Sequence, residues 1–144
     1  MSDVWDGIAD EFLHLYPRGR RLVAVAGADA ERSRVAADAL CAAIGARDQD
    51  VRRAHTSDGA DGPLRSDVIA PFREASGNDR ILVTSGPSAL LGQRARGLWN
   101  FSVWQLAGEE APHTVANAIV DVTDPDHPVR RFADYCALPS SYGA

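Results

Sequence analysis

The chain contains no lysine, and all 15 of its Lys/Arg positions are arginine. No lysine from anywhere in the chain can therefore supply positive charge to a phosphate-binding site. Cysteine is also scarce, since only Cys41 and Cys136 are present and they lie far apart in the sequence. Two distant thiols exclude a disulfide framework and a thiolate metal cluster, and they favour a cytoplasmic protein.

Long apolar runs and an excess of positive charge are missing as well. No segment approaches the roughly 20 apolar residues that cross a bilayer, and the acidic, amphipathic start of the chain is unlike a signal peptide. The net charge of −5 excludes the basic surface that nucleic acids and anionic membranes select. We therefore expect no nucleic-acid partner and no membrane association.

The composition that remains is ordinary for a globular protein, with 45% hydrophobic and 24% charged residues. At 144 residues the chain can form one sizeable hydrophobic core. We expect a single domain over residues 1–137, followed by a flexible tail over residues 138–144.

Short apolar runs alternate with helical patterns along the chain. A first helix is expected from its cap at Ser2 to Pro17, and its apolar face carries Trp5, Ile8, Phe12 and Leu15. The other expected helices are residues 31–44 (with Gly45 as C-cap), 64–72 (kinked or shortened by Pro71) and 88–96. The expected strands are residues 22–26, 51–56, 81–84, 101–106 and 118–122, and a turn is expected at 85–87 after the third of them. This alternation predicts an α/β fold of three α/β/α layers around a five-stranded, mostly parallel sheet, with strand 51–56 at an edge.

The junction between the first strand and the second helix is the most informative segment. A strand, a glycine turn and a helix form the frame of a phosphate-binding loop, whose pattern is G-x-x-x-x-G-K-[ST]. Here the second glycine, the lysine and the hydroxyl residue of that pattern are replaced by Arg32, Ser33 and Arg34. Arg32 adds a Cβ, Ser33 carries no charge, and Arg34 would repel Mg²⁺. We interpret the segment as a vestigial phosphate loop formed by Gly27, Ala28, Asp29, Ala30, Glu31, Arg32, Ser33 and Arg34.

In this order, the segments resemble the uridine kinase-like branch of the P-loop kinases. Residues 18–27 resemble the entry to that family's first strand, and residues 69–72 (Ile-Ala-Pro-Phe) resemble its Leu-Asp-Pro-Leu stretch. Residues 98–104 (Leu-Trp-Asn-Phe-Ser-Val-Trp) are similar to its Leu-Trp-Asp-Leu-Ser-Val-Phe segment, and residues 118–125 to its last strand and Asn-Thr-Asp turn. The resemblance covers most of the chain and implies a sheet of the P-loop NTPase type.

The departures from the family pattern carry the functional interpretation. Ser85 stands where the family has an acidic residue that helps to order Mg²⁺, and Ser57-Asp58 stands in place of its Asp-Asp pair. Residues 105–116 contain no arginine and are too few to form the family's lid. Because phosphoryl transfer depends on positioning and charge neutralisation, we expect a non-catalytic relative with no cofactor and no metal site. Asp58 is the one candidate catalytic residue, and a turn-forming role explains it as well.

Alternative interpretations remain open. Arg32 and Arg34 are interpreted as solvated side chains, but either guanidinium could bind phosphate through its fork. The chain would then be a small kinase that uses ATP and Mg²⁺, or a nucleotide or anion sensor. The leading interpretation is instead a binding or interaction module, which acts as a homodimer or with a protein partner.

Other candidate residues have ordinary structural explanations. The four histidines show no metal-ligand spacing. We interpret Arg130-Arg131 as a solvated basic pair, and Asp121 and Asp124 as residues whose side chains stabilise a turn. Trp5, Trp99 and Trp104 could form an exposed aromatic patch. We expect them instead to pack in the core or against helices.

Overall fold

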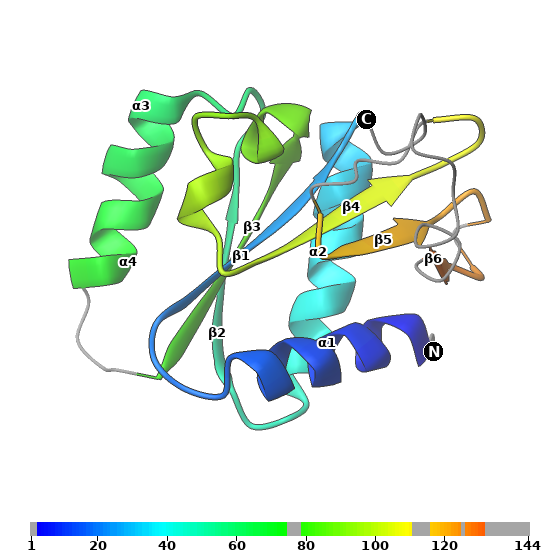
Figure 1. Ribbon diagram of the computed structural model, residues 1–144, viewed down its shortest axis with the longest axis horizontal. Helices are drawn as coiled ribbons and strands as arrows, with labels where there is room; N and C mark the ends of the chain where they lie inside the picture. Colours follow the sequence, from blue (N-terminus) through cyan, green and yellow to red (C-terminus); the bar gives the residue numbers. More distant parts are fainter. Residues whose placement is uncertain (1–2, 75–78, 111–115, 125, 132–144) are drawn as a thin grey trace.

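A computed structural model of the protein describes residues 3–74, 79–110, 116–124 and 126–131. Its strands form one six-stranded sheet in the order β2-β3-β1-β4-β5-β6 (Figure 1). Strands β1 to β5 run parallel, and β6 pairs antiparallel with β5. The strands are β1 (Arg21–Gly27), β2 (Asp50–His55), β3 (Arg80–Pro87), β4 (Phe101–Leu106), β5 (Ala118–Asp121) and β6 (Val129–Arg131).

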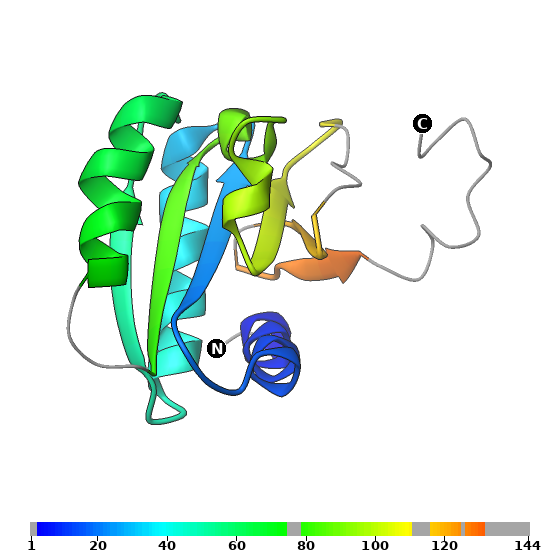
Figure 2. The same cartoon turned by 60° about the vertical axis from the view of Figure 1, so that its left-hand side comes forward.

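Helices cover both faces of the sheet (Figures 1 and 2). The helices α1 (Asp3–Leu15) and α2 (Ala30–Gly45) pack on one face. The other face is covered by a helical segment made of α3 (Asp61–Pro63), the π-helix η1 (Leu64–Ile69) and α4 (Ala70–Glu74), and by the 3₁₀ turns η2 (Ser88–Leu91) and η3 (Arg96–Leu98). The expected α/β fold with a mostly parallel sheet flanked by helices is confirmed.

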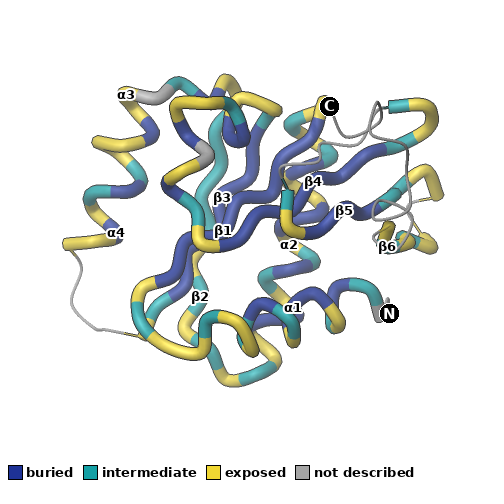
Figure 3. Tube along the Cα trace, in the orientation of Figure 1, coloured by how far each residue is buried: buried dark blue, intermediate teal, exposed yellow. Residues whose placement is uncertain are grey.

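The core consists of two apolar layers separated by the sheet (Figure 3). Strand β1 lies between β3 and β4, and every one of its residues is buried because helices cover both of its faces. Alternate residues of β1 therefore contribute to opposite layers: Val23 and Val25 face α1 and α2, whereas Leu22 and Ala24 face the other side. Strand β2 lies at the edge of the sheet, as expected from its weak alternation.

The expectation of five strands is wrong, because β6 adds a sixth. Its residues lie in a polar stretch of the chain where no local pattern indicates a strand. The pairing of Val120 with Arg130 holds the strand in place, and the Arg130 guanidinium forms an ion pair of 2.8 Å with Glu11 of α1. Arg131 forms an ion pair of 2.7 Å with Asp121. The interpretation of Arg130-Arg131 as a solvated pair is therefore wrong for Arg130, whose side chain is largely buried, whereas that of Arg131 is half exposed.

The helix expected over residues 64–72 is neither shortened nor ended by Pro71. The chain forms a π-helical stretch just before the proline, in which the N–H of Ala70 donates to the carbonyl of Arg65. The wider π turn accommodates a ring that would clash with the carbonyl four residues earlier in an α-helix. It also changes the spacing of the apolar face, so that Ile69 is buried and Val68 only half-buried.

Other local expectations are corrected. The helix predicted over residues 88–96 is wrong, since η2 ends at Leu91 and is followed by Gly92, whose backbone is extended (φ −71°, ψ 169°). The turn predicted over 85–87 is wrong because β3 continues to Pro87. Gly45 is the last residue of α2, and Ala46, with right-handed helical angles, caps the helix in its place. Leu15 is 54% exposed although it was expected on the buried face of α1. The cap at Ser2, Cys136 and the tail over 138–144 lie outside the described residues.

Candidate functional site

The turn between β1 and α2 is much shorter than a phosphate loop. Only Ala28 and Asp29 link the two elements, so the residues from Ala30 to Arg34 already belong to the helix. Asp29 is the N-cap: its carboxylate accepts hydrogen bonds from the backbone N–H of Glu31 at 2.8 Å and of Arg32 at 3.3 Å. The N–H groups that would face a phosphate at this helix terminus are thus bonded to a carboxylate of the chain itself.

A buried glutamine lies beneath this turn. The side chain of Gln105, at the carboxyl end of β4, is completely buried, and its Nε2 lies 3.5 Å from the carbonyl oxygen of Asp29 and 3.4 Å from Oγ of Ser33. The Ser33 hydroxyl donates to the same carbonyl at 3.1 Å. The position that a lysine would have in a phosphate loop is therefore a neutral, buried hydroxyl that stabilises the first turn of α2.

The two arginines of the vestigial loop are paired with carboxylates. Arg32 forms an ion pair with Glu110, whose other oxygen accepts the N–H of Ala107 at 3.0 Å. The side chain of Arg32 is only 33% exposed, so its interpretation as a solvated residue is wrong. Arg34 is about half exposed and lies 3.6 Å from Glu31 in the preceding turn.

Asp58 lies in an exposed turn that follows β2. Its carboxylate accepts hydrogen bonds from the N–H of Ala60 at 3.0 Å and from the Thr56 hydroxyl at 3.3 Å. Both bonds are local and stabilise the turn, which is the structural role that the sequence also permitted. Asp121 and Asp124 bond to nearby residues in the same way, Asp121 to Thr123 and Asp124 to the N–H of Asp126.

Ser85 and His55 form the closest pair of potentially catalytic groups. Nδ1 of His55 lies 2.6 Å from Oγ of Ser85, and its Nε2 lies 3.9 Å from the Glu31 carboxylate. Burial, and next the positive charge of Arg34, lower the pKa of His55 below its usual value of 6.5. A neutral imidazole beside a hydroxyl could activate a nucleophile. Ser85, however, has no exposed surface, so the pair cannot reach a substrate in this conformation.

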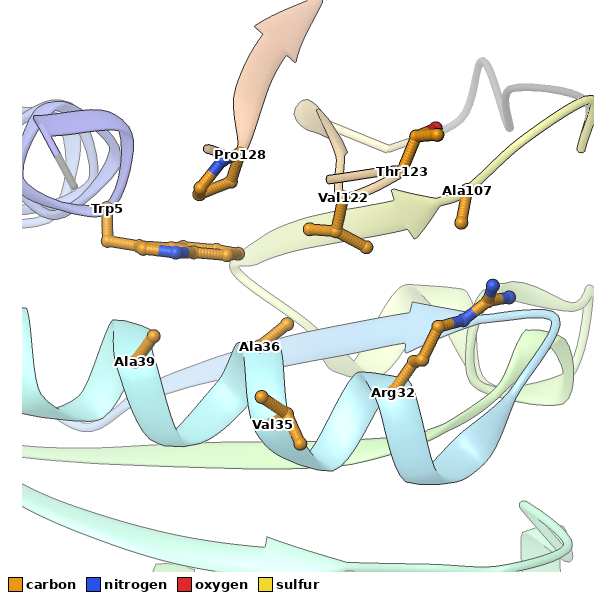
Figure 4. Close-up of a pocket in the computed structure, with 9 residues that line it drawn as sticks. All are labelled: Trp5, Arg32, Val35, Ala36, Ala39, Ala107, Val122, Thr123 and Pro128. Carbon is orange, nitrogen blue, oxygen red and sulfur yellow. The ribbon is translucent and has the colours of Figure 1, made fainter. Parts of the chain in front are cut away.

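A cavity lies elsewhere, between α1, α2 and the segments that follow β4 and β5 (Figure 4). It has a volume of about 460 Å³ and opens to solvent. Its lining residues are Trp5, Arg32, Val35, Ala36, Ala39, Ala107, Val122, Thr123 and Pro128. We call this cavity the α1–α2 pocket. Among the lining residues that the structure describes, all are apolar except Arg32 and Thr123, and only Arg32 is charged.

The sequence analysis did not identify this pocket. It placed Trp5 on the buried face of α1 and left Arg32 in solvent, and the structure brings both to the same cavity. The available signal was the pair of small residues Ala36 and Ala39 on the apolar face of α2, which leaves space beside a larger neighbour. Within the described part of the chain, no group of three or more His, Cys, Asp or Glu side chains could hold a metal ion. The helices described there are all too short or too polar to cross a membrane.

Comparison with known proteins provides no relative for this chain: no family model, no curated protein and no solved structure matches it.

Proposed function

We propose that the protein is a non-catalytic relative of the uridine kinase-like P-loop proteins, which acts as a binding or interaction module without transferring phosphate. The observation that carries the proposal is the position of Asp29 at the N-terminus of α2. Its carboxylate accepts the N–H groups of Glu31 and Arg32, which are the groups that a phosphate would need.

Electrostatics supports this proposal. A helix N-terminus carries a partial positive charge that attracts anions, but the Asp29 carboxylate lies at that terminus. A phosphate placed there would meet a negative charge and would have to displace two hydrogen bonds. The helix gains its capping energy, typically about 1 kcal/mol, from the side chain that keeps the phosphate out.

The groups that would stabilise a phosphoryl transition state are also absent from the turn. Ser33 is bonded to the backbone of Asp29, Ser85 to His55, and the Arg32 guanidinium to Glu110. Loss of a single stabilising donor typically costs about 10²- to 10³-fold in rate. The combined loss of lysine, acidic residue and lid supports binding without turnover.

Unfolding in the presence of nucleotides tests the proposal. We expect no change in Tm with ATP, ADP or GTP, with Mg²⁺ or with EDTA, and no phosphate release above that of a mock preparation. A ligand at about 100 times its Kd would raise the stability by roughly 2.7 kcal/mol, which is easily detected. A Mg²⁺-dependent increase that disappears in Arg32→Ala would support the kinase alternative, and a metal-independent increase would support the anion sensor.

A variant at the N-cap makes the test specific. Asp29→Ser keeps a capping oxygen and removes the charge, so we expect inorganic phosphate to stabilise this variant more than the unaltered protein. Asp58→Ser, in another exposed turn, is the matched control and should not respond to phosphate. Sedimentation velocity of the full chain over a range of concentrations tests the homodimer that the proposal includes.

A further inference from the structure

We propose that the α1–α2 pocket binds a small, uncharged and largely apolar molecule that has a hydrogen-bond acceptor at one end. This inference rests on the proposed function in one respect: it names the class of molecule that a binding module of this shape would take. The pocket includes neither Ala28 nor Asp29 of the turn between β1 and α2, but it does include Arg32 in the first turn of α2.

The shape of the pocket fits a flat or elongated apolar molecule. Its volume of about 460 Å³ lies within the range of roughly 300 to 1,000 Å³ that is typical of small-molecule sites. Figure 4 shows the Trp5 ring at one end and the Arg32 side chain at the other, with Ala36 and Ala39 on one side and Val122 and Pro128 on the other. A ligand would therefore lie along α2, with its apolar body against the indole ring.

The open space results from the small residues of α2. Ala36 and Ala39 present only methyl groups to the cavity, and Val35 at its rim is 69% exposed. An exposed valine beside a cavity lined by a tryptophan leaves apolar surface in contact with water. A ligand that covered this surface would gain about 25 cal/mol for each Å² of apolar area removed from water.

Arg32 provides the polar end of the site. One terminal nitrogen of its guanidinium donates to Glu110, and the side chain keeps 33% of its surface exposed. Figure 4 shows the guanidinium at the end of the pocket away from Trp5. An acceptor on a ligand would take a hydrogen bond from the exposed part of this guanidinium, and that donor defines one end of the molecule.

The charge of the pocket favours an uncharged acceptor. The positive charge of Arg32 is already balanced by the Glu110 carboxylate, which also accepts the N–H of Ala107. An anionic ligand group would approach a carboxylate that is already in place, and it would lose its own hydration on entering an apolar cavity. A ketone, ether or amide oxygen can accept a hydrogen bond from the exposed part of the guanidinium without these costs.

Prodan is a suitable probe, because it is an uncharged naphthalene that carries one ketone oxygen and its emission shifts to the blue in apolar surroundings. We expect saturable binding of one prodan per chain. Dimethylaminonaphthalene, which lacks the ketone, should bind about tenfold more weakly, as expected for the loss of a hydrogen bond to a charged donor. An anilinonaphthalene sulfonate, which is anionic, should bind more weakly than prodan.

Two variants with matched controls locate the binding. Ala39→Leu fills the pocket and should weaken prodan binding at least tenfold, whereas Ala42→Leu, the same change on the exposed face of α2, should not. Arg32→Met removes the donor and should weaken prodan about tenfold but the ketone-free probe by less than about twofold. Arg34→Met, on the exposed side of the same helix, is its control. Thermal unfolding of each variant verifies that it is folded, and Ala39→Leu tests the site independently if Arg32→Met does not fold.

Several results would overturn the inference. Prodan binding that is unchanged in Ala39→Leu would show that the probe binds elsewhere. Equal effects of Arg32→Met on both neutral probes would remove the role of the Arg32 guanidinium as a donor, and tighter binding of the sulfonate than of prodan would contradict the uncharged ligand. Phosphate release from ATP, measured on the same preparations, would contradict the proposed function alone, because it does not depend on what the α1–α2 pocket binds.

Discussion

Gln105 occupies the space into which a side chain at position 27 would point. A Cβ on Gly27 would overlap the Gln105 amide and approach the Gln105 carbonyl to 2.9 Å. The glycine that aligns with the first glycine of a phosphate loop is therefore required here by the packing of β1 against β4.

Replacement of this glycine should destabilise the fold. We expect Gly27→Ala to lower the free energy of unfolding by about 1 to 3 kcal/mol, as is typical for an overpacked core. Gly7→Ala is the control: nothing lies within 4 Å of a Cβ there, and alanine in α1 should raise the stability by about 0.5 to 1 kcal/mol. Urea unfolding of both variants measures the difference. Equal stabilities for Gly27→Ala and the unaltered protein would contradict the packing role of Gln105.

The two arginines of β6 should differ in their contribution to stability. The side chain of Arg130 is 18% exposed and joins β6 to Glu11 of α1, whereas that of Arg131 is 50% exposed. We expect Arg130→Met to cost about 1 to 3 kcal/mol and Arg131→Met less than about 1 kcal/mol. Thermal and urea unfolding provide the measurement, and a larger loss in Arg131→Met would contradict it.

Stability should decrease as the pH falls below 6.5, in part because of His55. Burial and the nearby charge of Arg34 lower the pKa of His55 in the folded protein. In the unfolded chain, His55 has its usual pKa of 6.5, so it takes up a proton at a pH where the folded protein does not. The contribution of neutral His55 to the free energy of unfolding is therefore complete above pH 6.5 and is lost as the pH falls from 6.5 toward the lower pKa of the folded protein. His55→Asn, which keeps an acceptor near the Ser85 hydroxyl, should show a weaker pH dependence in urea unfolding between about pH 5 and 8, the range over which histidine titrates. An identical pH profile in both proteins would contradict this assignment.

Cys41 should react slowly with thiol reagents at neutral pH. Burial raises the pKa of its thiol to about 12, so almost none of the reactive thiolate is present. We expect a Cys136→Ser variant, in which Cys41 is the only thiol, to be alkylated by iodoacetamide much more slowly than free cysteine. Addition of urea should restore the ordinary rate. Rapid alkylation of the folded variant would show that Cys41 is more accessible than its half-buried position indicates.

Much of the sheet could be predicted because its signals are local. The apolar runs of β1 and β4 are visible in the sequence, and the observed strands, Arg21–Gly27 and Phe101–Leu106, agree with the expected ones to within one residue at each end. β6 could not be predicted in this way, since its three residues show no local strand pattern and are held by pairing with β5 and by the ion pair of Arg130 with Glu11, 119 positions earlier. The π-helix likewise arises from how the chain accommodates Pro71 within a packed segment.

The functional residues were harder to interpret than the strands. Asp29 has the residue type of an N-cap and could have been recognised as one, but the alignment with a longer loop placed the start of the helix one residue later, at Glu31. The α1–α2 pocket depends on how α1 packs against α2 and on the path of the chain after β5. No periodicity within one segment contains that information.

The ion pair between Arg130 and Glu11 also constrains the order in which the chain folds while it is synthesised. Glu11 leaves the ribosome early, whereas Arg130 follows 119 residues later. Until then β5 lacks its antiparallel neighbour, and α1 lacks its ion pair with that end of the sheet. These contacts therefore form last when the chain folds during synthesis. A ribosome that stalls before residue 129 would release a product without the ion pair that joins β6 to Glu11.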